Sequence, residues 1–367
     1  MSADVSVVAF LPEVLVLAGA LLVFLLDVLG VKRLEVLGGV AVATTAGALL
    51  LVLGDLGFAP LALLGTIPTG QVDALPPTDL AQASLFAFSS LGLVFQAIFL
   101  LAALLVSLAS LSRPSAERGA AIFFGLLLVA TLGMLLVAIA ADLIFLLLAV
   151  EVVGIATYLM VGYTRRDPRG LEAAMKFYIV GALSTALSFF GASLLFGAYG
   201  STSFLALSQE TGTVGFPALA LVGYALLIAG LGFKLTLVPF HAWAVDVYDG
   251  APDDVSAFLA GGTKKIGLFA FFLVFIGPVT IAGRLAACAP GACAPAVFDF
   301  APTFQLILAL VAVLTMTVGN VLALLQREMK RMLAYSSISQ AGYMLIGIAV
   351  GTSPAIAGAT FQVFAHV

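Results

Sequence analysis

Long apolar segments alternate with short polar connections along almost the whole chain. Segments such as FFGLLLVATLGMLLVAIA at 123–140 are apolar on every face, whereas strands of a transmembrane β-barrel alternate strictly over about ten residues. A spanning helix needs about 20 mostly apolar residues. The pattern therefore predicts an all-α polytopic membrane protein with about eleven transmembrane helices. We expect them at 6–30, 35–54, 84–112, 119–140, 143–163, 172–199, 217–248, 255–280, 303–325 and 332–350, with an eleventh from Pro354 to the end of the chain.

The composition supports a membrane protein. Of the 367 residues, 63% are hydrophobic and only 9% are charged, whereas soluble domains carry about 25% charged residues. A water-soluble globular domain and a disordered chain are therefore both excluded. The 15 basic and 19 acidic residues are dispersed without a basic stripe. We therefore expect the lipid bilayer as the surrounding medium and no nucleic-acid partner.

The basic residues predict the orientation in the membrane. They lie in the connections after spans one, three, five and nine, whereas those after spans two, four and six contain acidic residues and no Lys or Arg. The positive-inside rule then places the N-terminus outside a plasma membrane. The acidic connection after span seven, with Asp249, Asp253 and Asp254, and an external Arg284 depart from the rule. The supporting basic residues are Lys32, Arg33, Arg113, Arg118, Arg165, Arg166, Arg169, Arg327, Lys330 and Arg331.

The two cysteines, Cys288 and Cys293, lie in a connection that this orientation places outside. Without a nearby histidine they are too few for a zinc or iron–sulfur site. One small disulfide and two free thiols are equally compatible with the sequence. We expect no metal and no cofactor bound by this chain.

Charged residues interrupt four consecutive spans. An ionised side chain at the middle of a spanning helix costs about 2.5–3.5 kcal/mol, so such residues indicate function by default. Glu151 and Lys234 lie deep in spans five and seven, while Lys176 lies near the start of span six, where snorkelling to the headgroups is the structural alternative. Lys264 and Lys265 are adjacent in span eight. Neighbouring positions differ by about 100° around a helix, so periodicity alone does not decide which lysine faces an interior path.

Pro239 predicts a break within span seven, because proline removes a backbone hydrogen bond. Irregular backbone at membrane depth is tolerated where it is buried or lines a wet cavity. His241 beside the break is therefore a candidate relay group, with a structural histidine bonded to a freed carbonyl as the alternative. A glutamate and several lysines in consecutive spans favour a proton relay over structural ion pairs, because a lysine beside an acid gains or loses its proton as the acid moves.

Four ordered segments resemble the antiporter-like membrane subunits of respiratory complex I, NADH:quinone oxidoreductase, and within that family the subunit N group. The third also carries the proline, the histidine and three of the lysines discussed above. The segments are LLLAVEVVGIATYLMVGY (146–163), EAAMKFYIVGALSTALSFFGASLLFGAYGS (172–201), FKLTLVPFHAWAVDVYDGAP (233–252) with FLAGGTKKIGLFAF (258–271), and NVLALLQREMKRMLAYSSISQAGYMLIG (320–347).

The resemblance implies a fold of about fourteen helices with two inverted five-helix repeats, each with a broken helix, the first being span seven. It implies Glu151 as the acid of the first half-channel, Lys234 as its partner, and Lys264 as the lysine that passes protons onward. Lys176 and His241 match further family positions. Lys264 is preferred over Lys265, which is then expected to face a neighbouring helix or the headgroups. The implied divisions are helices 1–3 at 1–118, a first repeat at 119–280, and the start of a second repeat at 281–367.

Three features depart from the family pattern. Val245 stands where proline is usual, Gln340 stands where many members have histidine, and the chain ends in the eleventh helix, before the second broken helix. We therefore expect the second repeat to be incomplete in this sequence.

The function implied is that of a proton-translocating subunit of NADH:quinone oxidoreductase or a close relative. NADH, or another reduced donor, and quinone would be handled by partner subunits, which include sister antiporter-like chains. This chain would contain no redox centre. A subunit of a multisubunit sodium/proton antiporter and a structural membrane scaffold are the alternatives.

Overall fold

The computed structural model describes residues 7–58, 85–112, 119–164, 168–204, 207, 217–276 and 301–367. Some residues used for the orientation and the cysteine loop lie outside these ranges. They are Arg113, Arg118, Arg165, Arg166, Glu210, Arg284, Cys288 and Cys293. The predicted divisions after 118 and 280 also fall outside the described residues and stay predictions.

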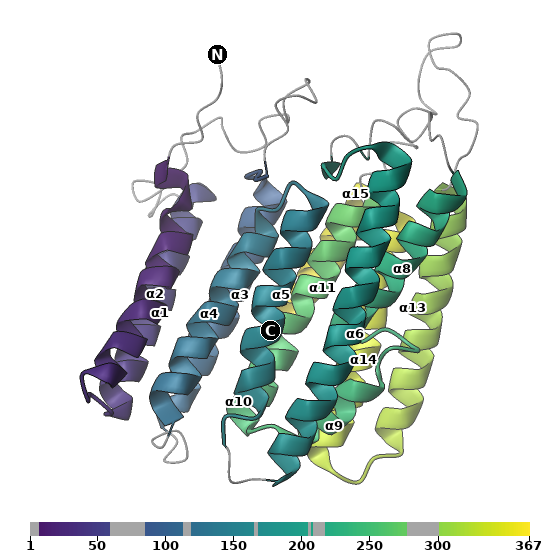
Figure 1. Ribbon diagram of the computed structural model, residues 1–367. Coiled ribbons are helices and arrows are strands. Elements are labelled where there is room, and N and C mark those ends of the chain that lie inside the picture. The colour runs from purple at the N-terminus through teal and green to yellow at the C-terminus, as the bar shows by residue number, and fades with distance from the viewer. Residues whose placement is uncertain are drawn as a thin grey trace.

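Helices of spanning length pack side by side in one bundle (Figure 1). Within the described residues, ten segments are long and apolar enough to cross a membrane, which confirms the predicted all-α, multi-pass fold. Nine of them are α1 (Leu11–Val28), α2 (Leu34–Asp55), α3 (Ser90–Ser110), α4 (Ala120–Ala138), α5 (Leu143–Val161), α6 (Pro168–Tyr199), α8 (Pro217–Leu235), α13 (Ala301–Leu324) and α14 (Met329–Val350). The tenth, Asp253–Phe275, is a composite span. A shorter helix, α15 (Ser353–Ala365), begins where the eleventh was predicted.

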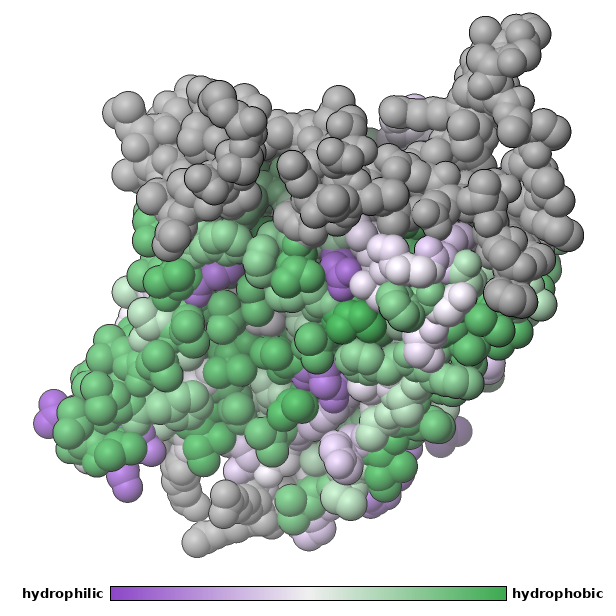
Figure 2. Space-filling model, turned by 45° about the horizontal axis from the view of Figure 1, so that its top comes forward, coloured by the Kyte–Doolittle hydropathy of each residue, from purple (hydrophilic) through white to green (hydrophobic). Residues whose placement is uncertain are grey.

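The outer surface of the bundle is apolar. Figure 2 shows hydrophobic residues over most of the described part of one face, with few hydrophilic residues between them. Large exposed side chains such as Leu21, Leu183 and Leu310 are 56–61% exposed. In a soluble domain such a surface would aggregate. Here it is the surface expected against lipid acyl chains.

The seventh span is interrupted, as predicted, but earlier than the proline itself. The helix α8 ends at Leu235, and α9 (Ala242–Gly250) resumes after six non-helical residues. Leu235 lies four positions before Pro239, and a proline ring in a helix clashes with the carbonyl of that position. Thr236 adopts a left-handed backbone conformation with φ of 60°, which is uncommon for a β-branched residue. The break is therefore a loop rather than a kink.

Two polar side chains satisfy backbone groups that this break releases. The hydroxyl oxygen of Thr315, from α13, accepts a hydrogen bond from the Val238 N–H at 3.1 Å. The Trp243 indole N–H donates to the Phe233 carbonyl, also at 3.1 Å. Buried backbone groups without partners would oppose such a loop at membrane depth. The sequence pattern alone did not predict this role for Trp243.

The eighth span is not a uniform helix either. It consists of α10 (Asp253–Phe258), a π-helical turn η6 (Leu259–Thr263), α11 (Lys264–Phe271) and a second π-helical turn η7 (Phe272–Ile276). A π-helical turn carries more residues than an α-helical turn and is frequent at functional sites. It changes the direction of every side chain that follows. Lys264 and Lys265 both follow η6 in the regular helix α11, so they still differ by about 100° around that helix, but the turn shifts the direction of both relative to α10.

Candidate functional site

Glu151 faces the neighbouring helices α6 and α8 from the middle of α5. The Thr185 hydroxyl of α6 donates a hydrogen bond of 2.7 Å to its Oε2. Glu151 and Lys234 both line a cavity of about 10 Å³ between these three helices, close to the smallest space that holds one water. Within the described part of the chain, the two groups share this cavity without a direct ion pair. Their charges still interact across the cavity, because salt screens partly buried charges only weakly.

Lys234 lies near the end of α8, just before the break. Its Nζ donates a hydrogen bond of 2.9 Å to the Tyr158 hydroxyl and lies 5.0 Å from the centre of that ring, within the range of a cation–π contact. Glycine makes the room for this arrangement. A Cβ atom on Gly154 would lie 2.7 Å from Nζ, and one on Gly181 would overlap the Tyr158 hydroxyl.

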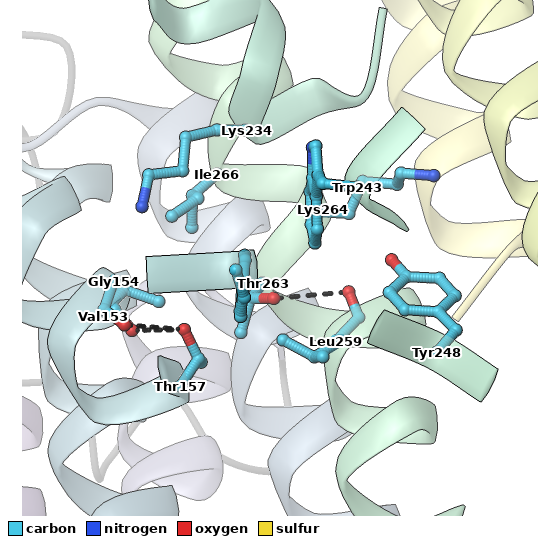
Figure 3. Close-up of a pocket in the computed structure, with 11 residues that line it drawn as sticks. Val153, Gly154, Thr157, Lys234, Trp243, Tyr248, Leu259, Thr263, Lys264 and Ile266 are labelled. Atoms are coloured by element: carbon cyan, nitrogen blue, oxygen red, sulfur yellow. Dashed lines mark hydrogen bonds between the residues drawn. The ribbon is translucent and has the colours of Figure 1, made fainter. Parts of the chain in front are cut away.

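A second cavity, of about 20 Å³, separates Lys234 from Lys264 (Figure 3). It has room for about one water molecule. Thr157, Trp243 and Tyr248 contribute to its lining. Figure 3 shows the two ammonium groups on opposite sides, that of Lys234 beside Gly154 and that of Lys264 pointing away toward α14. Lys234 thus lines both cavities, and the order across the bundle is Glu151, Lys234, Lys264.

Lys264 is held by polar groups from two other helices. Only 4% of the residue is exposed, and its Nζ donates a hydrogen bond of 2.8 Å to the Ser337 hydroxyl of α14. The Tyr248 ring of α9 lies 5.8 Å from Nζ, and the Tyr248 hydroxyl also hydrogen-bonds Ser337. The sequence reading named neither Tyr248 nor Ser337, because both lie in other spans and neither carries a charge.

Of the two expectations for Lys265, a neighbouring helix and the headgroups, the first is the one observed, and Lys265 is not at the surface. It is 1% exposed. Its Nζ donates a 2.5 Å hydrogen bond to the Ala260 carbonyl and lies 2.9 Å from Nδ1 of His366 at the end of α15. The Ala260 carbonyl belongs to the π-helical turn η6, which directly precedes the two lysines. Both lysines are therefore interior groups that point to different neighbours.

Lys176 belongs to a separate polar cluster at the end of the bundle where α9 and α10 lie (Figure 1). Its Nζ lies 2.9 Å from Glu172 and 3.1 Å from Asp246, and the Lys176 side chain is 48% exposed. Arg331 approaches Asp246 and Asp249 at 3.4 Å. This is the snorkelling arrangement given above as the alternative, and Lys176 lines neither cavity.

The same cluster explains why the connection after span seven departs from the positive-inside rule. Asp249 pairs with Arg331, and Asp253 pairs with Lys330 at 2.7 Å. The basic partners come from the connection after span nine and the start of α14. The acidic residues therefore lie beside the basic residues that defined the same side of the membrane.

His241 lies inside the break, away from both cavities. Its imidazole interacts with the backbone of Pro239. Its buried Nδ1 has no hydrogen-bond partner among the described residues, which is rare for a buried polar atom. The structure thus brings Glu151, Lys234 and Lys264 together and leaves His241 and Lys176 apart from them.

Comparisons with known proteins agree with the resemblance inferred from the sequence. Residues 140–367, more than half of the chain, match the family model described as NADH:quinone oxidoreductase/Mrp antiporter, transmembrane. The chain is 37% identical over 356 residues to F(420)H(2) dehydrogenase subunit N of Methanosarcina mazei, covering 97% of this chain and 66% of that protein. It is 37% identical over 345 residues to NAD(P)H-quinone oxidoreductase subunit 2 of a Nostoc species, covering 90% of this chain and 62% of that protein.

A solved structure has the same fold. The chain superposes on one chain of respiratory complex I from Thermus thermophilus with bound aureothin, with a TM-score of 0.70 and 30% sequence identity. The match covers 96% of this chain and 67% of that one. The chain thus spans about two thirds of the length of its relatives (66% and 62% of the two curated proteins).

Proposed function

Because this chain belongs to the NADH:quinone oxidoreductase/Mrp antiporter family of membrane proteins, we propose that it moves protons across the bilayer as a subunit of a quinone-reducing complex. The observation that carries the proposal is the series Glu151, Lys234 and Lys264, joined by two water-sized cavities that meet at Lys234. Charged groups at this depth are costly in a purely structural role. A series of them with room for single waters suits proton transfer.

The proposed transfer depends on the position and charge of Glu151. An ionised Glu151 favours a protonated Lys234 across the smaller cavity. When Glu151 is neutralised, Lys234 can release its proton through a water in the larger cavity toward a neutral Lys264. Lys264 then holds the proton while it donates its hydrogen bond to Ser337. Each step moves one proton between two named nitrogen or oxygen atoms, and no electron is transferred in this chain.

The electron donor and the quinone belong to partner subunits in this proposal. The names of the relatives differ in the donor, F(420)H(2) in one and NAD(P)H in the other, although both chains resemble this one equally. The donor is therefore a property of the partners, which would include sister antiporter-like chains. The chain itself would bind neither NADH nor quinone.

The test is proton uptake during quinone reduction by the whole complex in proteoliposomes. Glu151→Gln keeps the shape of the side chain and its contact with Thr185 but removes the charge. We expect an assembled complex with a clearly lower proton uptake per quinone reduced. Wild-type uptake by an assembled Glu151→Gln complex would remove Glu151 from the path.

A sodium/proton antiporter subunit is the second candidate, because the family description covers both kinds of complex. Vesicles that contain the complex without its redox partners separate the two. Sodium-driven proton exchange in such vesicles supports the antiporter. A scaffold role predicts instead that Lys234→Ala impairs assembly but leaves pumping by the assembled complex intact.

The orientation is part of the proposal, with the N-terminus outside a plasma membrane. Lys32 and Phe58 flank the two ends of α2 and lie on opposite sides of the bilayer. In a chain without its native cysteines, Lys32→Cys should react with a membrane-impermeant reagent only from the cytoplasm. Phe58→Cys should react only from outside. Reversed labelling would invert the topology and the direction of each step.

A further inference from the structure

We propose that Tyr158 is a positioning residue for Lys234, which holds the ammonium group at the larger cavity, beside Gly154, and competes with Glu151 for it. The inference rests on the proposed proton transfer and adds the residue that sets its direction. Glu151, Gly154 and Tyr158 are spaced i, i+3 and i+7 along α5, so they lie on one face of that helix. The ammonium of Lys234 lies against Gly154, in the gap between the acid and the phenol.

The two partners of Lys234 lie at different cavities. Glu151 lines the smaller cavity, whereas Gly154 lines the larger one, which leads to Lys264. In the structure the ammonium donates to Tyr158 at 2.9 Å, and Glu151 accepts from Thr185 instead. Each member of the acid–lysine pair is thus held by a neutral hydroxyl. A small rotation of the lysine side chain would exchange Tyr158 for Glu151.

The Tyr158 hydroxyl has a fixed position. The residue is 6% exposed, and its ring packs edge-to-face on Phe177 with the centroids 4.6 Å apart. Phe177 in turn stacks on Trp243, with the ring centroids 4.5 Å apart. Trp243 is the residue whose indole N–H donates to the Phe233 carbonyl at the break in span seven. Gly181 provides the space for the hydroxyl. The packing therefore links the position of this acceptor to the geometry of the broken helix.

A neutral acceptor suits this task for a physical reason. A hydroxyl oxygen binds an ammonium group less strongly than a carboxylate does and does not neutralise its charge. Lys234 can therefore be held at the larger cavity and still be drawn back when Glu151 is ionised. Without the hydroxyl, Glu151 would be the stronger remaining partner, and the lysine would stay at the smaller cavity.

The experiment measures proton uptake per quinone reduced by the whole complex in proteoliposomes, normalised to assembled complex. Tyr158→Phe keeps the ring and removes only the hydroxyl, and we expect about a tenfold loss of uptake. Tyr178→Phe is the matched control. Its side chain lies on α6, is 55% exposed and has a ring 6.0 Å from that of Tyr158, and this variant should behave as wild type.

A double variant separates positioning from packing. Glu151→Asp shortens the competing acid by one methylene group and should weaken its hold on Lys234. In the Tyr158→Phe background we expect this change to restore part of the lost uptake. A purely structural role for Tyr158 predicts no rescue, and a double variant as poor as Tyr158→Phe or poorer would overturn the proposal.

If Tyr158→Phe fails to assemble, Gly181→Ala provides the second test, because the added Cβ displaces the phenol without changing it. Gly197→Ala, on the same helix, meets only the end of the Leu219 side chain and is its control. Lys234→Met is measured in parallel. Full proton uptake by Lys234→Met would refute the proposed function itself. If Lys234→Met loses uptake but Tyr158→Phe, or an assembled Gly181→Ala, keeps wild-type uptake, only the role of Tyr158 is refuted.

Discussion

The first four helices and the region from α8 to α11 differ in the regularity of their helices and in the groups that they bury. In α1–α4 every helix is continuous, and large side chains such as Phe99, Phe123 and Phe124 are fully buried. The buried charged residue of these helices is Glu13, which is 4% exposed and accepts a 2.7 Å hydrogen bond from Gln96. In α8–α11 a loop and two π-helical turns interrupt the helices, and three lysines lie inside.

The difference shows where a membrane protein can place a buried cation. A regular helix uses nearly all of its backbone carbonyls in its own hydrogen bonds. An interrupted helix leaves carbonyls free, and the Ala260 carbonyl in η6 accepts directly from Lys265. Irregular backbone also leaves small cavities where single waters fit. Continuous helices therefore provide the frame of this protein, and the interrupted ones provide the polar partners that buried charges require.

The largest expected effect is that of Lys264→Met. The variant removes the last ammonium group of the series and the hydrogen bond to Ser337, so proton uptake should fall by about two orders of magnitude. Assembly should be preserved, because replacing a buried charge with an apolar side chain often leaves stability unchanged or raises it. Uptake in proteoliposomes is compared with that of Lys32→Met, which changes an exposed lysine near α2. Wild-type uptake by Lys264→Met would exclude Lys264 from the relay.

Lys265→Met should have a smaller effect, and chiefly on stability. The Ala260 carbonyl and Nδ1 of His366 both lose their partner, at a cost of about 1–3 kcal/mol for each unsatisfied group. We expect a shorter half-life of the complex at raised temperature and only a few-fold loss of uptake. Abolished uptake in this variant together with normal uptake in Lys264→Met would show that the two lysines exchange roles.

Trp243→Phe tests whether the polar partners of the break matter. The phenyl ring can still stack on Phe177, but the Phe233 carbonyl loses the indole N–H, which contributes about 1 kcal/mol. The expected result is a moderately shorter thermal half-life with assembly preserved. Phe123→Tyr, which adds a hydroxyl to the apolar packing of the first four helices, gives the corresponding change in the other region. An unchanged half-life in Trp243→Phe would mean that water replaces the indole at the break.

Glu13→Gln should have the smallest effect. The amide oxygen at position 13 can still accept the hydrogen bond from Gln96. The substitution changes no group of the proposed proton relay. Proton uptake should match the wild type, and thermal stability should be equal or slightly higher because a buried ionisable group is lost. A loss of uptake comparable to that of Lys264→Met would contradict the contrast between the two regions and add the first helices to the proton path.

Much of the fold could be predicted because it depends on local properties of the chain. Transfer of an apolar segment into lipid depends on its own residues, so nine of the ten spans were placed within about six residues of the observed helices. The seventh was predicted to reach residue 248, and its spanning helix ends at Leu235. A proline in mid-span prevents a regular helix wherever it lies, and so Pro239 predicted the break. The insertion cost of charged residues singled out Glu151, Lys234 and Lys264, and the family resemblance supplied their order.

The contacts of those charges could be decided only by the tertiary structure. Lys234 and Tyr158 are 76 residues apart in the chain, and Lys265 and His366 are 101 apart. No pattern within one span reports which side chain of another span lies opposite. The π-helical turn that precedes Lys265 was not predicted either, because the two glycines of its sequence LAGGT weaken a regular α-helix but do not specify a π-helical turn. The sequence by itself determined which groups are costly to bury, because that cost depends on each segment alone. The tertiary structure decided which partners offset the cost, because those partners come from other helices.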